Sequence, residues 1–139
     1  MSTKTRILLV DDEKVNLITG KSIIEGAIDN IICDTAQSGN QAIEKFKEKE
    51  NRYHIIVLDM LMPEPDGFQT AEEITKYCTK NNISLPHMIS YTVLDTNEIQ
   101  NQAVKCGIID YVAKGNRSAL IKIIEKWVPV SRKRDIRIK

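Results

Sequence analysis

The sequence of 139 residues is poor in cysteine and histidine and has no long apolar run. Its three cysteines, Cys33, Cys78 and Cys106, are odd in number and lack metal-ligand spacing, which argues for buried thiols in a reducing cytoplasm. No apolar stretch approaches the roughly 18 residues of a membrane span. The N-terminus turns acidic too early for a signal peptide. The formal net charge of +1 gives no overall attraction to nucleic acid or membranes.

The two histidines, His54 and His87, flank apolar runs and have no partner in the sequence. We expect both at the surface or at an edge, without a catalytic role. A protein that lacks clustered histidines and cysteines must build any metal site from oxygen ligands.

Five short apolar runs alternate with amphipathic stretches. The runs cover residues 6–10, 31–35, 55–59, 87–92 and 108–113. They are continuous, as in strands that are buried on both faces. Strict β-α alternation indicates a parallel sheet with helices on both faces, and right-handed crossovers favour the strand order 2-1-3-4-5. The sequence therefore predicts an α/β fold, a doubly wound, flavodoxin-like (βα)5 three-layer sandwich with a five-stranded parallel sheet.

The amphipathic stretches predict which side chains face the core. The first helix, over 14–27, is expected to bury Val15, Ile18 and Ile23, with Leu17 and Ile24 beside that stripe. The helices that follow have these candidate N-caps: Ser38, Asp66, and Asp95 or Thr96. The last helix carries an apolar stripe made of Leu120, Ile123, Ile124 and Trp127. We expect one domain over 5–128 and a basic tail or linker over 129–139 without a helical pattern.

Charged residues follow three of the apolar runs. Asp11 and Asp12 come after the first, Asp59 stands at the end of the third, directly after the residues IIVL, and Lys114 follows the fifth. In the order 2-1-3-4-5 these positions meet at one edge of the sheet, at the point where ligands bind in such folds. Three carboxylates in one pocket repel each other, and a divalent cation or a lysine relieves that repulsion. Oxygen ligands alone favour Mg²⁺ or Mn²⁺.

This set suits phosphate chemistry. A carboxylate can act as a nucleophile and form an aspartyl phosphate, and a metal with a lysine supplies the charge that phosphoryl transfer needs. Thr92 ends the neighbouring strand and can hydrogen-bond a group on Asp59; Ser90 shares its facing but lies one step deeper. The alternatives are ordinary: Asp11 and Asp12 could cap a helix, Asp59 could start a loop, and Lys114 could lie at the surface.

The motifs ILLVDDE, DMLMPEPDG and DYVAK, together with Thr92, resemble the receiver domain of the response-regulator family over 5–128. The resemblance implies that Asp59 accepts phosphate from a phosphohistidine. It also implies that Mg²⁺ is bound by Asp11, Asp12, Asp59 and the backbone carbonyl of Leu61. Thr92 and Tyr111 would be the switch residues, and Lys114 would pair with the phosphoryl group. Such a domain is a signalling module, not an enzyme beyond assisting its own phosphorylation and dephosphorylation.

The chain departs from the family's pattern beside these residues. Gly115 stands where the family usually has proline, so we expect a trans Lys114–Gly115 bond. Val93 replaces a very small residue and is expected to crowd the approach to Asp59. Leu61 and Leu94 can neither orient a water nor donate a proton, which predicts a slowly hydrolysing phosphoaspartate. The alternative function is a phosphorylation-independent interaction module; flavin binding fits poorly, because an acidic turn follows the first run.

The expected partner is a histidine kinase or a histidine phosphotransfer domain, docked on Leu17 and Ile24. The fold also allows a homodimer through the fourth helix, the fifth strand and the fifth helix. The few residues after Trp127 leave no room for a DNA-binding domain in this chain. The DDEKVNL run resembles receivers attached to hybrid histidine kinases.

Overall fold

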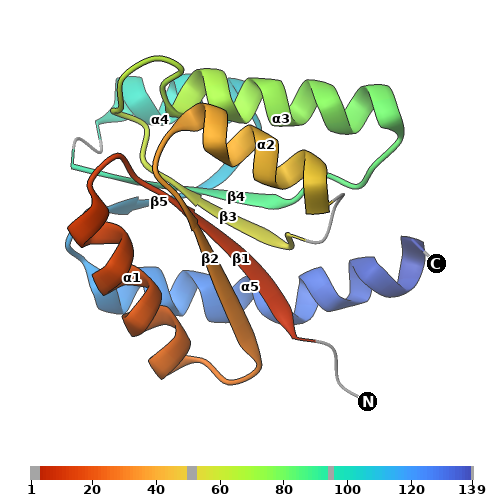
Figure 1. Ribbon diagram of the computed structural model, residues 1–139, viewed down its shortest axis with the longest axis horizontal. Coiled ribbons are helices and arrows are strands. Elements are labelled where there is room, and N and C mark those ends of the chain that lie inside the picture. The colour runs from red at the N-terminus through yellow and green to blue at the C-terminus, as the bar shows by residue number, and fades with distance from the viewer. Residues whose placement is uncertain (1–3, 50–52, 94–95, 139) are drawn as a thin grey trace.

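A computed structural model of the chain describes residues 4–49, 53–93 and 96–138, with side chains described up to Ser131 except at position 49. Five parallel strands form one sheet in the order β2-β1-β3-β4-β5. Helices α1 and α5 cover one face of this sheet, and α2, α3 and α4 cover the other (Figure 1). The predicted three-layer α/β fold and its strand order are confirmed.

The elements lie close to the predicted runs. The strands are β1 (Thr5–Val10), β2 (Ile31–Ala36), β3 (Ile55–Leu58), β4 (His87–Thr92) and β5 (Ile108–Ala113). The helices are α1 (Lys14–Ala27), α2 (Gly39–Lys49), α3 (Gly67–Asn81), α4 (Asn97–Lys105) and α5 (Arg117–Ile138). Among the described helices none combines the length and the hydrophobicity that crossing a bilayer requires.

The three central strands, β1, β3 and β4, bury both of their faces, as continuous apolar runs predict, while the edge strand β5 leaves Ile109 41% exposed. One cluster of side chains, with Leu8, Ile56 and Met88 from the sheet, packs under α2, α3 and α4. A second cluster, with Leu9 and Val57, packs under α1 and α5. All three cysteines are buried, as expected. Burial raises the pKa of the Cys33 thiol to about 12, so that this thiol is protonated at neutral pH.

Side-chain caps fix the starts of the helices on the α2, α3 and α4 face. Asp66 forms a reciprocal capping box with Gln69 at the start of α3. Ser38 Oγ accepts the Gln41 N–H, and Thr96 is the N-cap of α4. These three caps confirm the prediction, while Asp95 lies outside the described residues.

Helix α1 faces the sheet with a different stripe from the one predicted. Leu17 and Ile24 are 5% and 0% exposed, whereas Val15 and Ile18 are 71% and 61% exposed. The stripe that packs on the sheet has Gly20 at its centre, where an added Cβ would come within 2.6 Å of Leu9 Cδ2. The prediction was wrong because it counted apolar side chains and gave no weight to a glycine at a close helix–strand contact.

Helix α5 continues to Ile138, past Pro129, so the expectation of a non-helical tail is wrong. Trp127 stacks on His87 with 4.5 Å between ring centroids, and Ser131 is fully buried. The helix therefore still packs against the protein after its predicted end. Lysine and arginine, which dominate the last residues, are good helix formers.

We expected His54 at the surface or at an edge, but it is only 5% exposed, so a position at the surface is excluded. Its Nδ1 accepts the Arg6 N–H at 3.0 Å, and its own N–H donates to Arg6 O at 2.9 Å. The imidazole thus extends the backbone pairing between β1 and the start of β3. This structural role explains a buried histidine far from the acidic residues.

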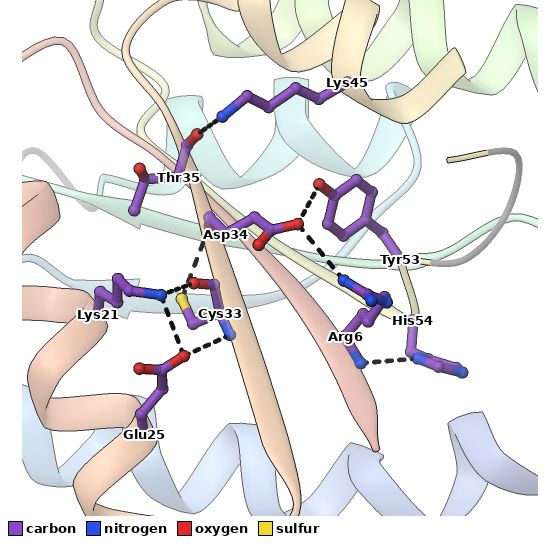
Figure 2. A network of polar contacts seen from close by, with 9 residues as sticks. All are labelled: Arg6, Lys21, Glu25, Cys33, Asp34, Thr35, Lys45, Tyr53 and His54. Atoms are coloured by element: carbon purple, nitrogen blue, oxygen red, sulfur yellow. Dashed lines mark hydrogen bonds and ion pairs between the residues drawn. The ribbon is translucent and has the colours of Figure 1, made fainter. Parts of the chain in front are cut away.

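Strand β2 lies at one edge of the sheet, and side chains from both layers cover its outer backbone groups (Figure 2). Glu25 Oε2 accepts the Cys33 N–H at 2.9 Å, and Lys21 Nζ donates to the Cys33 carbonyl. From the opposite face, Lys45 Nζ donates to the Thr35 carbonyl. Unpaired edge groups are templates for pairing with another chain, and these three side chains occupy them.

Candidate functional site

The predicted acidic and basic residues meet at the carboxyl edge of the sheet. Asp11 follows β1, Asp59 follows β3, and Lys114 follows β5. Strand-like hydrogen bonds extend the ladder to all three: Asp11 N to Ala36 O, Asp59 N to Val10 O, and Lys114 N to Thr92 O, at 3.1, 3.1 and 2.9 Å. The backbone therefore fixes the origin of each side chain, as the strand order predicts.

Lys114 bridges two of the carboxylates. Its Nζ lies 2.6 Å from Asp11 Oδ2 and 2.9 Å from Asp59 Oδ2. Burial disfavours the charged ammonium, but hydrogen bonds and charge attraction from Asp11 and Asp59 outweigh that effect, so the pKa of Lys114 is raised above its ordinary value. The ammonium is therefore fully charged at neutral pH.

Asp59 is 4% exposed and receives three donors. Its Oδ1 accepts Thr92 Oγ1 and the Leu61 N–H, both at 3.1 Å, while its Oδ2 accepts Lys114 Nζ. A buried carboxylate needs such partners. The same donors would surround any group that becomes attached to this carboxylate.

Asp11 is also nearly buried and is held by the loop that follows β1. Its Oδ1 accepts the Glu13 N–H at 2.9 Å, and its Oδ2 lies 3.4 Å from Asn16 Nδ2. Asp12 is exposed at the mouth of the site. The sequence reasoning missed the Asn16 contact, although a polar residue one helical turn past an acidic pair is a usable signal.

Three carboxylates can share one cation. Asp11, Asp12 and Asp59 each offer an oxygen, and these atoms all lie within 4.8 Å of one another. Asp11 and Asp59 are buried, whereas Asp12 is exposed. Hard oxygen donors of this kind fit Mg²⁺.

A tight turn after Asp59 shapes the floor of the site. Gly67 opens α3, and a Cβ at this position would lie 2.4 Å from Met60 Cα and 2.5 Å from Asp59 O. Its N–H donates to Met60 O at 3.1 Å. The glycine therefore permits helix α3 to start directly against the backbone that carries Asp59.

Thr92, rather than Ser90, contacts Asp59. Ser90 Oγ is buried on the same side of β4 and has no hydrogen-bond partner among the described residues. Tyr111 pairs in register with Ser90 on the adjacent strand and is half-buried against the cluster under α2, α3 and α4. The geometry brings Thr92 to the acidic residues and places Tyr111 one strand away.

The surround of the site is partly apolar and open. Leu61 and Val93 are 41% and 67% exposed, while Leu94 lies outside the described residues. The cis peptide bond among the described residues is Glu64–Pro65, so the predicted trans Lys114–Gly115 bond is confirmed. Gly115 adopts φ +97°, which favours glycine.

A cavity of about 380 Å³ adjoins the site between α1 and the start of α5. Leu9, Ile24 and Leu120 line its apolar part, and Asp11 and Lys114 reach its edge. The sequence did not predict this cavity, because its walls come from four separate elements. Apolar cavities of this size with a few polar groups are typical of small-molecule or side-chain binding.

Comparison with known proteins places this geometry in a family. The sequence profile of the response regulator receiver domain matches residues 7–125. Hybrid signal transduction histidine kinase L of Dictyostelium discoideum is 30% identical over 129 residues, which are 88% of this chain and 7% of that protein. Chemotaxis protein CheY of Halobacterium salinarum is 29% identical over 109 residues, 78% of this chain and 83% of that protein.

A solved structure with the same fold is that of the Saccharomyces cerevisiae histidine phosphotransfer protein Ypd1 with the receiver domain of the response regulator Ssk1. It matches with a TM-score of 0.81 and 24% identity, over 91% of this chain and 90% of that chain. The chain spans less than a third of the length of the first curated relatives that it matches, at 29%, 7% and 7%. With its acidic pocket at the predicted strand ends, the chain belongs to the response regulator receiver domain family and is a receiver domain of two-component and phosphorelay signalling.

Proposed function

We propose that Asp59 is the residue that accepts the phosphoryl group, from the phosphohistidine of a partner protein. A carboxylate oxygen of Asp59 attacks phosphorus, the P–N bond to the donor imidazole breaks, and its electron pair remains on the imidazole nitrogen. The observation that carries this proposal is the convergence of Lys114 and Thr92 on one buried carboxylate, at 2.9 and 3.1 Å.

The product carries more negative charge than the resting site, so cations must offset it. Lys114 supplies one positive charge in a largely buried position. Asp11, Asp12 and Asp59 would hold Mg²⁺ or Mn²⁺, with the backbone carbonyl of Leu61 as a further ligand. Such an ion, when bound, offsets charge on the phosphoryl oxygens.

Thr92 and Tyr111 are the residues to which we assign the change of conformation. Thr92 already donates its hydroxyl to Asp59 Oδ1 and can donate it to a phosphoryl oxygen after transfer. Movement of Thr92 frees space on the face of the sheet where Tyr111 packs. Val104 and Ile109, 58% and 41% exposed, lie on α4 and β5 and support a homodimer through α4, β5 and α5.

The partner that we propose is a histidine kinase or a histidine phosphotransfer domain. Leu17 and Ile24, the docking residues expected from the sequence, are buried, so we propose Val15 and Ile18, which are exposed on α1, in their place. A pair of exposed apolar side chains beside an acidic pocket suits a helical partner that must bring a histidine to Asp59. The hybrid kinase among the relatives supports an origin in a hybrid histidine kinase, and the reduced, buried cysteines suit a cytoplasmic protein.

The test is phosphorylation followed by intact mass. The protein is incubated with Mg²⁺ and acetyl phosphate, and a gain of one phosphoryl group is expected for wild type. Asp59→Asn, which keeps the size of the side chain, is expected to gain none. Asp29→Asn is the matched control, because Asp29 is exposed in the turn before β2; it should be labelled like wild type.

The alternative is an interaction module that acts without phosphorylation. Gly115 and the exposed Val93, which depart from the family's pattern, favour it. It predicts that wild type and Asp59→Asn are equally unlabelled and bind a partner equally well. Labelling that depends on Asp59 would reject this alternative.

A further inference from the structure

The loop from β5 to α5 carries Lys114, and the residue that follows this lysine lies in open space. Gly115 follows the lysine with φ +97°, and a Cβ built on it meets no atom within 4 Å. On one side of this loop lies the cavity of about 380 Å³ that Lys114 and Gly115 help to line. A glycine beside open space has large conformational freedom, so hydrogen bonds must set the position of the loop.

Three backbone N–H groups of this loop are hydrogen-bonded. Lys114 N donates to Thr92 O at 2.9 Å, which continues the sheet, and Asn116 N donates to Ala113 O at 3.0 Å, which closes a local turn. The N–H of Gly115 donates to the hydroxyl of Tyr91 at 3.0 Å. This third bond links the loop to a side chain of the neighbouring strand.

Tyr91 is well suited to fix a position. It precedes Thr92 on β4, and successive side chains of a strand point to opposite faces. Thr92 therefore reaches Asp59 on one face, while Tyr91 reaches the loop from the other. The ring of Tyr91 packs against the buried cluster under α1 and α5, and its hydroxyl meets Gly115 at the wall of the cavity.

We propose that Tyr91 is a positioning residue for Lys114. Its hydroxyl accepts the Gly115 N–H and so holds the backbone from which the lysine reaches Asp59. A proline at position 115 would have no N–H to donate. Gly115 does have one, and the hydroxyl oxygen of Tyr91 accepts it. The inference rests on the proposed function, in which Lys114 meets the phosphoryl group.

The experiment compares Tyr91→Phe with wild type by titration with beryllofluoride, a stand-in for the phosphoryl group, in the presence of saturating Mg²⁺. The substitution removes the hydroxyl and keeps the ring. Without this hydrogen bond the loop must be ordered when the ligand binds, at a cost of up to about one net hydrogen bond, so we expect beryllofluoride affinity to fall by about three- to tenfold. Affinity for Mg²⁺ alone should stay within about twofold of wild type, and exchange of the Gly115 amide hydrogen should become faster.

Tyr53→Phe is the matched control. It removes another tyrosine hydroxyl, which donates to Asp34 Oδ2 at 2.6 Å on β2. This variant should lose stability and keep wild-type affinity for beryllofluoride.

Unchanged beryllofluoride affinity in Tyr91→Phe, with wild type binding normally, would overturn the positioning role. An equal loss of Mg²⁺ and beryllofluoride affinity would overturn it as well, because it would indicate general loosening of the site. If wild type itself fails to bind beryllofluoride, the proposed function fails, and that result is distinct from the first two.

Discussion

Lys114 Nζ lies closer to Asp11 than to Asp59, at 2.6 Å against 2.9 Å. The lysine therefore pairs with a carboxylate that is also proposed to hold the cation. Two positive charges on one carboxylate repel each other, so ammonium and metal must compete for Asp11 while both assist Asp59. This relationship makes the affinity for Mg²⁺ depend on the lysine.

Replacement of Lys114 by Met is expected to raise the affinity for Mg²⁺ by about tenfold, since it removes a cation a few ångströms from the metal position in a screened site. The same variant should bind beryllofluoride more weakly. Isothermal titration with Mg²⁺ measures the first effect. Lys122→Met, which removes an exposed charge on α5, is the control and should change Mg²⁺ affinity less than about twofold. A weaker Mg²⁺ affinity in Lys114→Met would contradict the competition.

The raised pKa of Lys114 predicts a pH dependence of stability. A basic group whose pKa is higher in the folded state stabilises the fold fully below its unfolded pKa, near 10.5, and loses that contribution as pH rises through the folded value. The difference in free energy of unfolding between wild type and Lys114→Met should therefore shrink above pH 10.5. Urea unfolding at several alkaline pH values measures it. Cys33, whose pKa is also raised, titrates in both proteins and cancels; a difference that grows with pH would refute the prediction.

The strand ends were predictable because the sheet is parallel and buried on both faces. Five continuous apolar runs fix the order of the strands, and the order alone brings Asp11, Asp59 and Lys114 together. Thr92 was distinguishable from Ser90 because Thr92 ends its strand, next to the acidic residues, whereas Ser90 lies one step deeper. The residues at strand ends can therefore be predicted from the sequence.

The face of α1 and the end of α5 were not predictable in the same way. Gly20 makes a close contact with Leu9, and a glycine contributes nothing to an apolar stripe. The basic residues of the tail showed no helical pattern in the sequence, but α5 continues through them, and Trp127 and Ser131 pack against the protein. The Tyr91–Gly115 hydrogen bond joins residues 24 positions apart, and only the fold reveals it.

Exposed Ile18 is expected to contact the phosphodonor protein. Ile18→Asp should slow phosphotransfer from a phosphorylated histidine phosphotransfer domain by about tenfold or more, because a charge replaces an apolar contact. Labelling by acetyl phosphate and the melting temperature should stay near wild type, since the residue is 61% exposed. Leu17→Asp should instead lose about 3 kcal/mol or more of stability, as it buries a charge. A wild-type rate of phosphotransfer to Ile18→Asp would show that this face of α1 does not contact the phosphodonor protein.

The phosphorylated protein is expected to hydrolyse slowly. The side chain of Leu61 is at the mouth of the site and 41% exposed, yet it can neither orient nor deprotonate a water. Leu61→Asn should shorten the lifetime of the phosphoaspartate by about five- to tenfold, because an amide can orient the attacking water through one hydrogen bond of about 1 kcal/mol. Loss of label over time with Mg²⁺ present measures it. A wild-type half-life of seconds would contradict the expectation. Leu61→Met, which keeps an apolar side chain at this position, serves as the control and should keep the wild-type lifetime.

Glu25 protects the edge of β2, and its removal should weaken the fold. Its Oε2 accepts the Cys33 N–H at 2.9 Å, and this hydrogen bond is the main reason why the pKa of Glu25 is lowered. Glu25→Ala leaves that N–H open to another strand and should cost about 1 kcal/mol of unfolding free energy, with faster aggregation. Glu25→Gln keeps an acceptor and should lose less on both measures. Chemical unfolding measures the stability of the two variants, and light scattering measures their aggregation. Equal stability and aggregation of the two variants would mean that the charge of Glu25, rather than its hydrogen bond to the strand, protects the edge.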